Sequence, residues 1–350
     1  MDFKSVIGRA NAGNASDIHL IVGLPPVFRI DGRLVNDGDT PLTNDEICAA
    51  VELITTEEER AAVEAKGEVD FAVSYENVRM RASVFRQQGN TSIALRLLPL
   101  TVPSAKQLCL PKVLIAQAEK PRGLVLVTGP TGSGKSSTLA ALLDHINNSS
   151  RRHMITLENP IEFIHQPKEC VINQREIGAD TESFAAGLRA ALRQDPDVIL
   201  VGEMRDLETI STAITAAETG HLVFGTLHTK GAADTIDRII DVFPAAQQPQ
   251  IRAQLAEVLE CVISQTLLPK KNGGRRAIFE IMVVNSAIRN LIRQSKTFQI
   301  TSTMQTNKTA GMQLLDDALV DAVRAGDISV EDALSAANDP AAVKVAAMRR

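Results

Sequence analysis

The hydrophobic pattern of the chain changes near residue 123. From there on, short continuous apolar runs are separated by segments with a helical spacing of apolar residues. Continuous runs of this length are typical of strands covered by helices on both faces of a parallel sheet. The runs fall at residues 124–127, 154–157, 198–201 and 222–224. The pattern predicts an α/β fold with a doubly wound sheet, followed by helices after about residue 285.

Residues 1–98 carry a different, mixed pattern of strands and helices. Residues 27–35 predict a hairpin, because Asp31-Gly32 supplies the positive φ angles of a tight turn. Residues 78–85 alternate between apolar and polar side chains, which predicts a strand with one buried face. We therefore expect a separate α+β domain before the doubly wound sheet.

Prolines are concentrated between these two regions. They are Pro99, Pro103, Pro111 and Pro121. Because proline fixes φ and disfavours helix in the preceding residue, this density predicts a semi-rigid connector. We expect an N-terminal domain at 1–98, a linker at 99–122, and a second domain with C-terminal helices at 123–350.

Composition excludes several classes of function. The 350 residues have a net charge of −5 and 3 % aromatic residues, so no overall charge favours nucleic acid and few rings are available for base stacking. The four cysteines are isolated, which does not favour a zinc site or a disulfide framework. No signal peptide or membrane span is predicted. We expect a cytoplasmic protein that meets a membrane only through partners.

A phosphate-binding motif follows the first apolar run. Its residues are Gly129, Pro130, Thr131, Gly132, Ser133, Gly134, Lys135 and Ser136, followed by Ser137. The glycines allow several backbone N–H groups to point at one phosphate, and the helix that follows adds a partial positive charge. Lys135 supplies a full charge, and the hydroxyl of Ser136 is a ligand for Mg²⁺. The alternative is a chance Gly-Ser loop, which the strand-loop-helix context disfavours.

Carboxylates follow two other apolar runs. Glu203 comes two residues after the run at 198–201, where an acid holds a water of the Mg²⁺ shell or orients the attacking water. Glu158 and Glu162 follow the run at 154–157, and Glu162 is a candidate general base. The alternative for both residues is a solvated surface position. For Glu162 this alternative fits the sequence as well as the role of a general base does.

Two histidines bracket the run at 222–227. His221 and His228 are seven residues apart, so in an extended segment they do not form a metal pair. A histidine at a strand end is more often a structural hydrogen-bonding group than a catalyst. Thr226 and His228 are also placed to sense the γ-phosphate from the next strand, and the residues alone leave both readings open.

Together these motifs resemble the PilT family, the type IV pilus retraction ATPases of the secretion ATPase superfamily. The resemblance rests on GPTGSGKSS (129–137), LENPIEF (157–163), DPDVILVGEMRD (195–206), TGHLVFGTLHT (219–229), AIRNLIR (287–293) and GMQLLDDAL (311–319). It implies a homohexameric ring whose subunits pair a PAS-like N-terminal domain with a RecA-like P-loop ATPase domain. It also implies ATP and Mg²⁺ as ligands, with ATP between the two domains, and an inner-membrane platform protein as partner.

The resemblance assigns roles to individual residues. It makes Lys135 and Ser136 phosphate and metal ligands, Glu162 the catalytic carboxylate and Glu203 the Walker B glutamate. It makes His221 and His228 nucleotide-sensing residues.

The resemblance also places three arginines of the N-terminal domain at the phosphates. They are Arg79, Arg81 and Arg96; a solvated strand face is the alternative. One departure from the family is Asn159, where the family usually has aspartate. The substitution removes one negative charge near the metal.

Three rival functions remain. A pilus assembly or type II secretion ATPase shares the superfamily but generally carries an additional N-terminal domain and often a four-cysteine insert. A nucleic-acid translocase with the same core is disfavoured by the acidic charge and the few aromatic residues. An ATP-binding regulatory scaffold with little turnover stays open because of Asn159.

Overall fold

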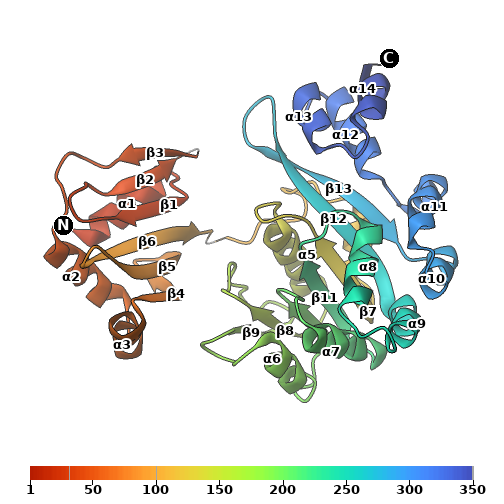
Figure 1. Cartoon of the computed structure of the whole chain (residues 1–350), viewed down its shortest axis with the longest axis horizontal. Helices are drawn as coiled ribbons and strands as arrows, with labels where there is room; N and C mark the ends of the chain where they lie inside the picture. The colour runs from red at the N-terminus through yellow and green to blue at the C-terminus, as the bar shows by residue number, and fades with distance from the viewer. Residues whose placement is uncertain (31, 100, 349–350) are drawn as a thin grey trace. The chain divides into compact units, whose positions relative to one another are not determined.

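The computed structural model describes residues 1–30, 32–99 and 101–348 (Figure 1). The chain divides into two compact units. The smaller unit comprises Met1–Thr101 together with Pro160–Ile164. The larger unit comprises Val102–Asn159 and His165–Arg350. A short segment of the acidic motif therefore belongs to the smaller unit, although the residues on either side of it belong to the larger one.

The smaller unit is an antiparallel sheet of six strands in the order β3-β2-β1-β6-β5-β4. Its strands are β1 (Asp17–Leu20), β2 (Val27–Ile30), β3 (Arg33–Asn36), β4 (Glu68–Tyr75), β5 (Val78–Gln87) and β6 (Asn90–Leu98). Its helices are α1 (Phe3–Ala12), α2 (Asn44–Ile54) and α3 (Glu57–Lys66). The predicted hairpin is confirmed as the pair β2–β3, while Asp31 of its turn lies outside the described residues.

One face of this sheet is buried. In β5, Val78, Met80, Ala82 and Val84 are at most 5 % exposed, whereas Arg79 and Arg81 between them are not buried. The buried residues pack in one cluster with apolar side chains of α1 and α2, which cover that face. The alternation predicted for 78–85 is thus confirmed, and it leaves the arginines on the face that the helices do not cover.

The larger unit is built on a sheet of seven strands in the order β13-β12-β7-β11-β10-β8-β9. All neighbouring strands are parallel except β12 and β13. The strands are β7 (Gly123–Thr128), β8 (His153–Glu158), β9 (Val171–Glu176), β10 (Val198–Val201), β11 (Leu222–Leu227), β12 (Leu259–Pro269) and β13 (Arg275–Val283). The four predicted apolar runs form β7, β11, β10 and β8, which are consecutive in this order.

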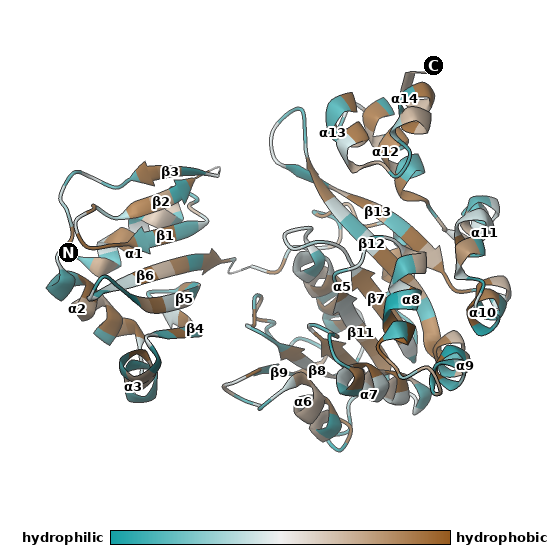
Figure 2. Cartoon of the chain, in the orientation of Figure 1, coloured by the Kyte–Doolittle hydropathy of each residue, from teal (hydrophilic) through white to brown (hydrophobic). Residues whose placement is uncertain are grey.

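Helices cover both faces of this sheet, which explains why β7, β10 and β11 are buried along their whole length and mostly apolar (Figure 2). One face packs against α4 (Lys112–Ala118) and α5 (Lys135–Ser149). The other packs against α6 (Phe184–Ala191), α7 (Leu207–Glu218), α8 (Ala232–Asp241), α9 (Gln248–Val258) and α10 (Ser286–Arg293). Helix α4 lies inside the predicted linker, and its Leu114 is fully buried. Residues 112–118 are therefore a packed helix of the larger unit rather than a connector.

The chain ends in further helices, as the pattern after residue 285 predicts. They are η1 (Thr297–Gln299), α11 (Ile300–Thr306), η2 (Lys308–Ala310), α12 (Leu315–Arg324), α13 (Val330–Ala336) and α14 (Pro340–Met348). Apolar residues of α12 and α13 pack together with Leu268 of β12 and Ile278 of β13. Within the described part of the chain, no helix is long and apolar enough to cross a membrane.

Candidate nucleotide-binding site

The carboxyl ends of the parallel strands bring most of the predicted site residues to one edge of the sheet. The phosphate-binding motif follows β7, His228 follows β11, Glu203 follows β10 and Glu158 ends β8. These strands are neighbours, and the edge at the carboxyl ends of parallel strands is where open α/β sheets bind ligands. The topology therefore assembles a single site from segments that are far apart in the sequence.

The phosphate loop turns directly from β7 into α5. Gly129, Gly132 and Gly134 have positive φ angles of 139°, 79° and 88°, which only glycine adopts readily. Gly134 is the N-cap residue of α5, so the free N–H groups of the first helical turn open onto the loop. The local conformation is that of an anion-binding loop.

Lys135 and Ser133 supply the polar side chains of this loop. The Lys135 Nζ donates hydrogen bonds to the carbonyl oxygens of Gly129 (2.8 Å) and Pro130 (3.0 Å), so the ammonium group lies over the loop. The Ser133 Oγ is buried and makes no hydrogen bond within the described residues. A buried hydroxyl without a partner, next to an ammonium group and a helix N-terminus, fits a phosphate oxygen. Ser136 and Ser137 lie in the first turn of α5 and are partly exposed.

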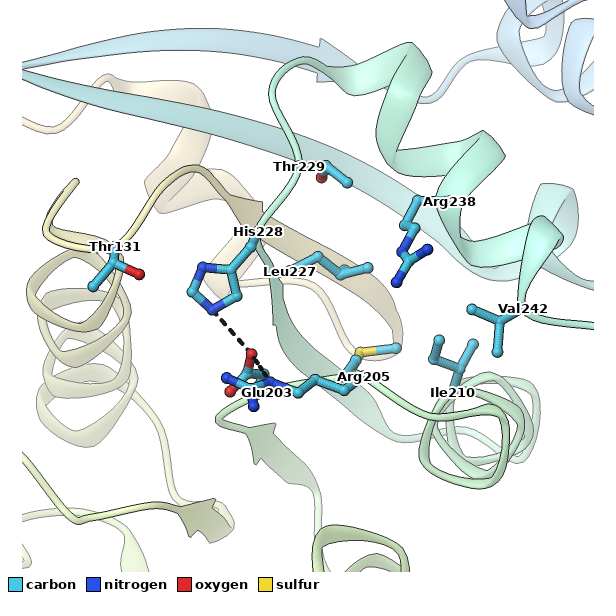
Figure 3. A pocket seen from close by; sticks show the side chains of 10 residues that line it. Thr131, Glu203, Arg205, Ile210, Leu227, His228, Thr229, Arg238 and Val242 are labelled. Carbon is cyan, nitrogen blue, oxygen red and sulfur yellow. Dashed lines mark hydrogen bonds and ion pairs between the residues drawn. The ribbon is translucent and has the colours of Figure 1, made fainter.

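Glu203 and His228 meet at a pocket of about 440 Å³ beside the phosphate loop (Figure 3). The His228 Nε2 lies 2.9 Å from a carboxylate oxygen of Glu203, which also pairs with Arg205. Thr131 of the phosphate loop lines the same pocket. The structure therefore places a carboxylate and an imidazole in contact, next to the loop that is expected to hold a triphosphate.

The backbone around Glu203 is held tightly between strands. The Met204 N–H donates to the Thr226 carbonyl (3.0 Å), and the Thr226 hydroxyl donates to the Gly202 carbonyl. Thr226 is only 5 % exposed. Its hydroxyl therefore positions the segment that carries Glu203, and the structure does not favour the alternative that Thr226 itself senses a phosphate.

Glu158 lies at the same edge but does not line this pocket. Its carboxylate accepts hydrogen bonds from the Thr156 hydroxyl (2.6 Å) and the Gln174 side-chain amide (3.2 Å). Glu162 belongs to the smaller unit, where the neighbouring Ile161 carbonyl accepts a hydrogen bond of 3.2 Å from the Arg79 Nε. The two carboxylates of the acidic motif thus belong to different units.

His221 lies at the opposite end of β11 from His228. Its Nδ1 is 2.8 Å from the Ala216 carbonyl, and its own carbonyl accepts from the Gly123 N–H at the start of β7. Strand β11 has six residues, so the two histidines are separated by roughly 20 Å along it. The structure does not bring His221 to the phosphate loop of its own chain, and its local contacts are those of a structural hydrogen-bonding group.

The three predicted arginines lie on the face of the smaller sheet that the helices leave uncovered. Arg81 and Arg96 are directly opposite each other on β5 and β6. Like charges in this position repel unless they are paired. Arg81 lies 3.7 Å from Asp70, and Arg96 donates to Asp17 at 2.9 Å. Burial acts to raise the pKa of Asp17, but hydrogen bonds from Ser16 and Arg96 outweigh it and hold that pKa below its ordinary value.

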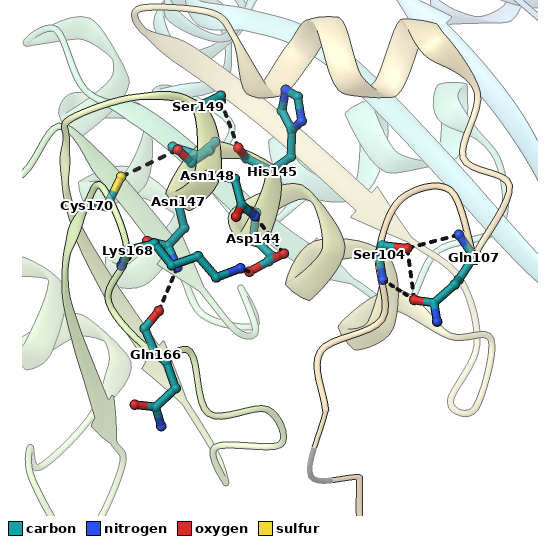
Figure 4. Close-up of polar contacts among 11 residues, drawn as sticks. Ser104, Gln107, Asp144, His145, Asn147, Asn148, Ser149, Gln166, Lys168 and Cys170 are labelled. Atoms are coloured by element: carbon teal, nitrogen blue, oxygen red, sulfur yellow. Dashed lines mark hydrogen bonds and ion pairs between the residues drawn. The ribbon is translucent and has the colours of Figure 1, made fainter.

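The chain that returns from the acidic motif is anchored to the far end of α5 (Figure 4). The Asn147 side chain accepts from the Lys168 N–H (3.0 Å) and donates to the Gln166 carbonyl (2.8 Å). The Lys168 ammonium pairs with Asp144 at 2.7 Å. Residues 165–170 are therefore fixed to the helix that begins at the phosphate loop.

Sequence reasoning missed two residues near the loop. Gln265 of β12 lies beneath it, and a glutamine inside a largely apolar strand is the signal that could have identified it. Arg238 reaches from α8 toward the pocket of Glu203 and His228 (Figure 3). Its position on a strongly amphipathic helix resembles an ordinary solvated charge, so the sequence offered no signal for it.

A phosphate loop between strand and helix on a doubly wound sheet, with a carboxylate at the end of a neighbouring strand, is the fold of the P-loop nucleoside triphosphatases. Comparison with known proteins is more specific. The family model described as "Type II/IV secretion system protein" matches residues 2–335. The chain belongs to this family of secretion ATPases and, within it, to the PilT branch of pilus retraction ATPases.

Three relatives support that placement. The "Type IV pilus retractation ATPase PilT" of Pseudomonas aeruginosa is 48 % identical over 97 % of this chain and 99 % of its own length. A "Twitching motility protein" of Neisseria gonorrhoeae is 49 % identical over 88 % of this chain and 83 % of its own. The crystal structure of the pilus retraction motor PilT with bound ADP superposes with a TM-score of 0.92 at 47 % identity, covering 99 % of both chains. The fold is thus that of the secretion ATPases, with a PAS-like α+β unit and a RecA-like core.

Proposed function

We propose that this chain is an ATP-hydrolysing motor that powers retraction of type IV pili and thereby twitching motility. The observation that carries the proposal is the near-complete match to a protein named as the pilus retraction ATPase, at 48 % identity over 97 % of this chain. The intact phosphate loop and the Glu203–His228 contact support it, because both parts that an ATPase needs are present at one edge of the sheet.

In this proposal the phosphate loop binds the triphosphate of ATP. The Lys135 ammonium, which lies over the loop, pairs with the β- and γ-phosphates, and the Ser133 hydroxyl donates to a phosphate oxygen. The N–H groups at the start of α5 complete the binding of the anion. These contacts concern only the phosphates, so they account for affinity toward nucleotides without choosing the base.

The donor set also fits a magnesium ion. Ser136 supplies a hydroxyl, and Glu203 and Glu158 supply carboxylates at the same edge, all of which are oxygen ligands that Mg²⁺ prefers. A magnesium ion held by these residues would supply positive charge beside the phosphates. Ser136, Glu203 and Glu158 would hold the ion or its waters.

Hydrolysis requires a water aligned with the γ-phosphate. We propose that Glu203 and His228, in contact at 2.9 Å, orient this water or sense the phosphate, and that Glu162 acts as the general base. Arg79, Arg81 and Arg96 are proposed to neutralise charge in the transition state. Their roles, and the coupling of ATP cleavage to movement of one unit against the other, stay predictions.

The remaining elements of the proposal concern assembly. We propose a homohexameric ring that acts on an inner-membrane platform protein from the cytoplasmic side. Light scattering of the purified protein with and without ATP gives the mass of the assembly. A monomer under both conditions would contradict the ring.

The central test is a phosphate-release assay on the purified protein with ATP and Mg²⁺. We expect turnover in the wild type and its loss in Lys135→Ala, because the ammonium group that pairs with the phosphates is gone. A wild type that binds ATP without releasing phosphate would instead support the regulatory scaffold. Unchanged hydrolysis in Lys135→Ala would remove the phosphate loop from the mechanism.

Deletion in the source organism separates retraction from assembly. Surplus surface pili with loss of surface motility support retraction, whereas cells without pili support assembly or secretion. The two outcomes are distinguished by counting pili on the same cells.

A further inference from the structure

Gln265 makes two buried hydrogen bonds, one to the end of the phosphate loop and one to the first turn of the helix that follows it. Its Nε2 donates to the Ser133 carbonyl at 2.7 Å, and its Oε1 accepts from the Thr138 hydroxyl of α5 at 2.8 Å. The three residues are 2 %, 3 % and 1 % exposed, respectively. A buried polar group is retained only when its hydrogen bonds are satisfied, and Gln265 satisfies both ends of its amide at this site.

The position of Gln265 follows from the register of the sheet. On β12, Ser264 is paired with Thr128, the last residue of β7, so Gln265 lies beside Gly129, where the phosphate loop begins. Alternate residues Cys261 and Ile263 of the same strand pack with α5. Gln265 continues that face by one more step, which brings its side chain beneath the loop.

We propose that Gln265 is a positioning residue that orients the Ser133–Gly134 peptide for phosphate binding. In a planar trans peptide the N–H points away from the carbonyl. Because Gln265 draws the Ser133 carbonyl toward β12, the Gly134 N–H is turned away from β12, toward the open side of the loop. This inference rests on the proposed function only in that the loop binds a nucleotide.

The close fit at two glycines supports this orienting role. A Cβ at position 134 would lie 2.8 Å from the Gln265 Nε2, and one at position 129 would lie 2.3 Å from the Gln265 carbonyl oxygen. A side chain at either end of the loop would thus force Gln265 to shift, its backbone at position 129 and its side-chain amide at position 134. The loop conformation is determined against β12 and not only by its own sequence.

The experiment measures binding of ADP with a fluorescent ribose label, in the presence of Mg²⁺, to the full-length protein. Gln265→Met keeps the side-chain volume and removes both hydrogen bonds, so we expect Kd to rise about tenfold. Gln265→Glu places a carboxylate oxygen against the Ser133 carbonyl, so we expect a larger rise. In steady-state assays KM should rise with kcat retained within about twofold, because the oriented N–H group binds the phosphates equally well in the ground state and in the transition state.

The matched control is Gln117→Met. Gln117 of α4 is 3 % exposed, and its Nε2 donates to the Val113 carbonyl at 3.3 Å, with no contact to the phosphate loop. We expect the melting temperature of this variant to fall and its affinity for ADP to stay unchanged. Thr138→Val provides a second variant if Gln265→Met does not fold; it removes the bond that holds the amide, and we expect Kd to rise about two- to threefold.

The outcomes separate this inference from the proposed function. A wild type that binds no labelled ADP would overturn both. A wild type that binds, with Gln265→Met and Thr138→Val binding equally well after correction for the folded fraction, would overturn the role of Gln265 alone. Weaker binding in both variants and unchanged binding in Gln117→Met would support it.

Discussion

The phosphate loop offers two glycines for which the structure predicts different responses to the same substitution. An alanine Cβ at position 129 would lie 2.3 Å from the Gln265 carbonyl oxygen and 2.8 Å from the Ser133 Oγ. A Cβ at position 132 would meet nothing within 4 Å. Both glycines have positive φ, so both substitutions carry a backbone cost, but only Gly129→Ala adds a steric clash with the backbone of β12.

The magnitudes follow from these contacts. Alanine in the left-handed region costs about 1–2 kcal/mol, which applies to Gly132 at φ 79°, and at Gly129, with φ 139°, the backbone cost is at least as large. A carbon and an oxygen normally stay about 3.3 Å apart, so the strand beside Gly129 must shift by about 1 Å. Overpacking of this kind costs about 1–3 kcal/mol more. At about 3 °C per kcal/mol, we therefore expect the melting temperature to fall by roughly 10 °C in Gly129→Ala and by roughly 4 °C in Gly132→Ala.

Thermal melting of both variants, followed by titration with labelled ADP, checks this reasoning. Gly129→Ala should also bind ADP more weakly than Gly132→Ala, since relief of the clash moves the loop away from Gln265. Equal melting temperatures together with equal affinities in the two variants would refute the view that β12 determines the loop conformation.

Two further predictions concern the histidines and a buried carboxyl. His228→Ala should lower kcat for ATP at least about tenfold, because it removes the contact to Glu203. His221→Ala should lower mainly the melting temperature. A greater loss of kcat in His221→Ala than in His228→Ala would contradict the assignment of His228 to the site. Burial raises the pKa of Glu280, although backbone N–H groups of Ala232 and Leu315 oppose it, so the folded protein binds this proton more tightly than the unfolded chain. The wild type should therefore lose stability relative to Glu280→Gln as the pH rises above about 4.3 and through the raised pKa. Melting curves of both proteins at about pH 5 and about pH 8 measure this. A difference in melting temperature that is the same at both pH values would contradict it.

The fold of the larger unit was largely predictable because its signal is local. Strands β7, β8, β10 and β11 each contain a continuous apolar run, and the phosphate-binding motif lies where a strand passes into a helix, so these parts could be predicted from local sequence, whereas the partly exposed β9 could not. The order β7-β11-β10-β8 was not predictable in this way, because it depends on how helices pack across the sheet.

Contacts between distant segments account for what the sequence did not reveal. The prolines between 99 and 122 predict a connector, yet Leu114 lies in a packed helix, because Pro111 is at the N-cap of α4, where proline is tolerated, and no proline interrupts residues 112–118. The histidines were treated together because they bracket one strand. Only the parallel register shows that His228 lies at the edge of the sheet that carries the site, and that His221 lies at the opposite edge.

The segment Pro160–Ile164 has a consequence for how the protein is dissected. Because this segment belongs to the smaller unit, the backbone passes from one unit to the other at three places, near residues 101, 159 and 164. A fragment that ends at residue 101 would thus lack the Ile161 carbonyl, which accepts a hydrogen bond from Arg79. An N-terminal fragment that reproduces the smaller unit must therefore also include residues 160–164. Glu162 then belongs to that fragment and not to the fragment with the phosphate loop.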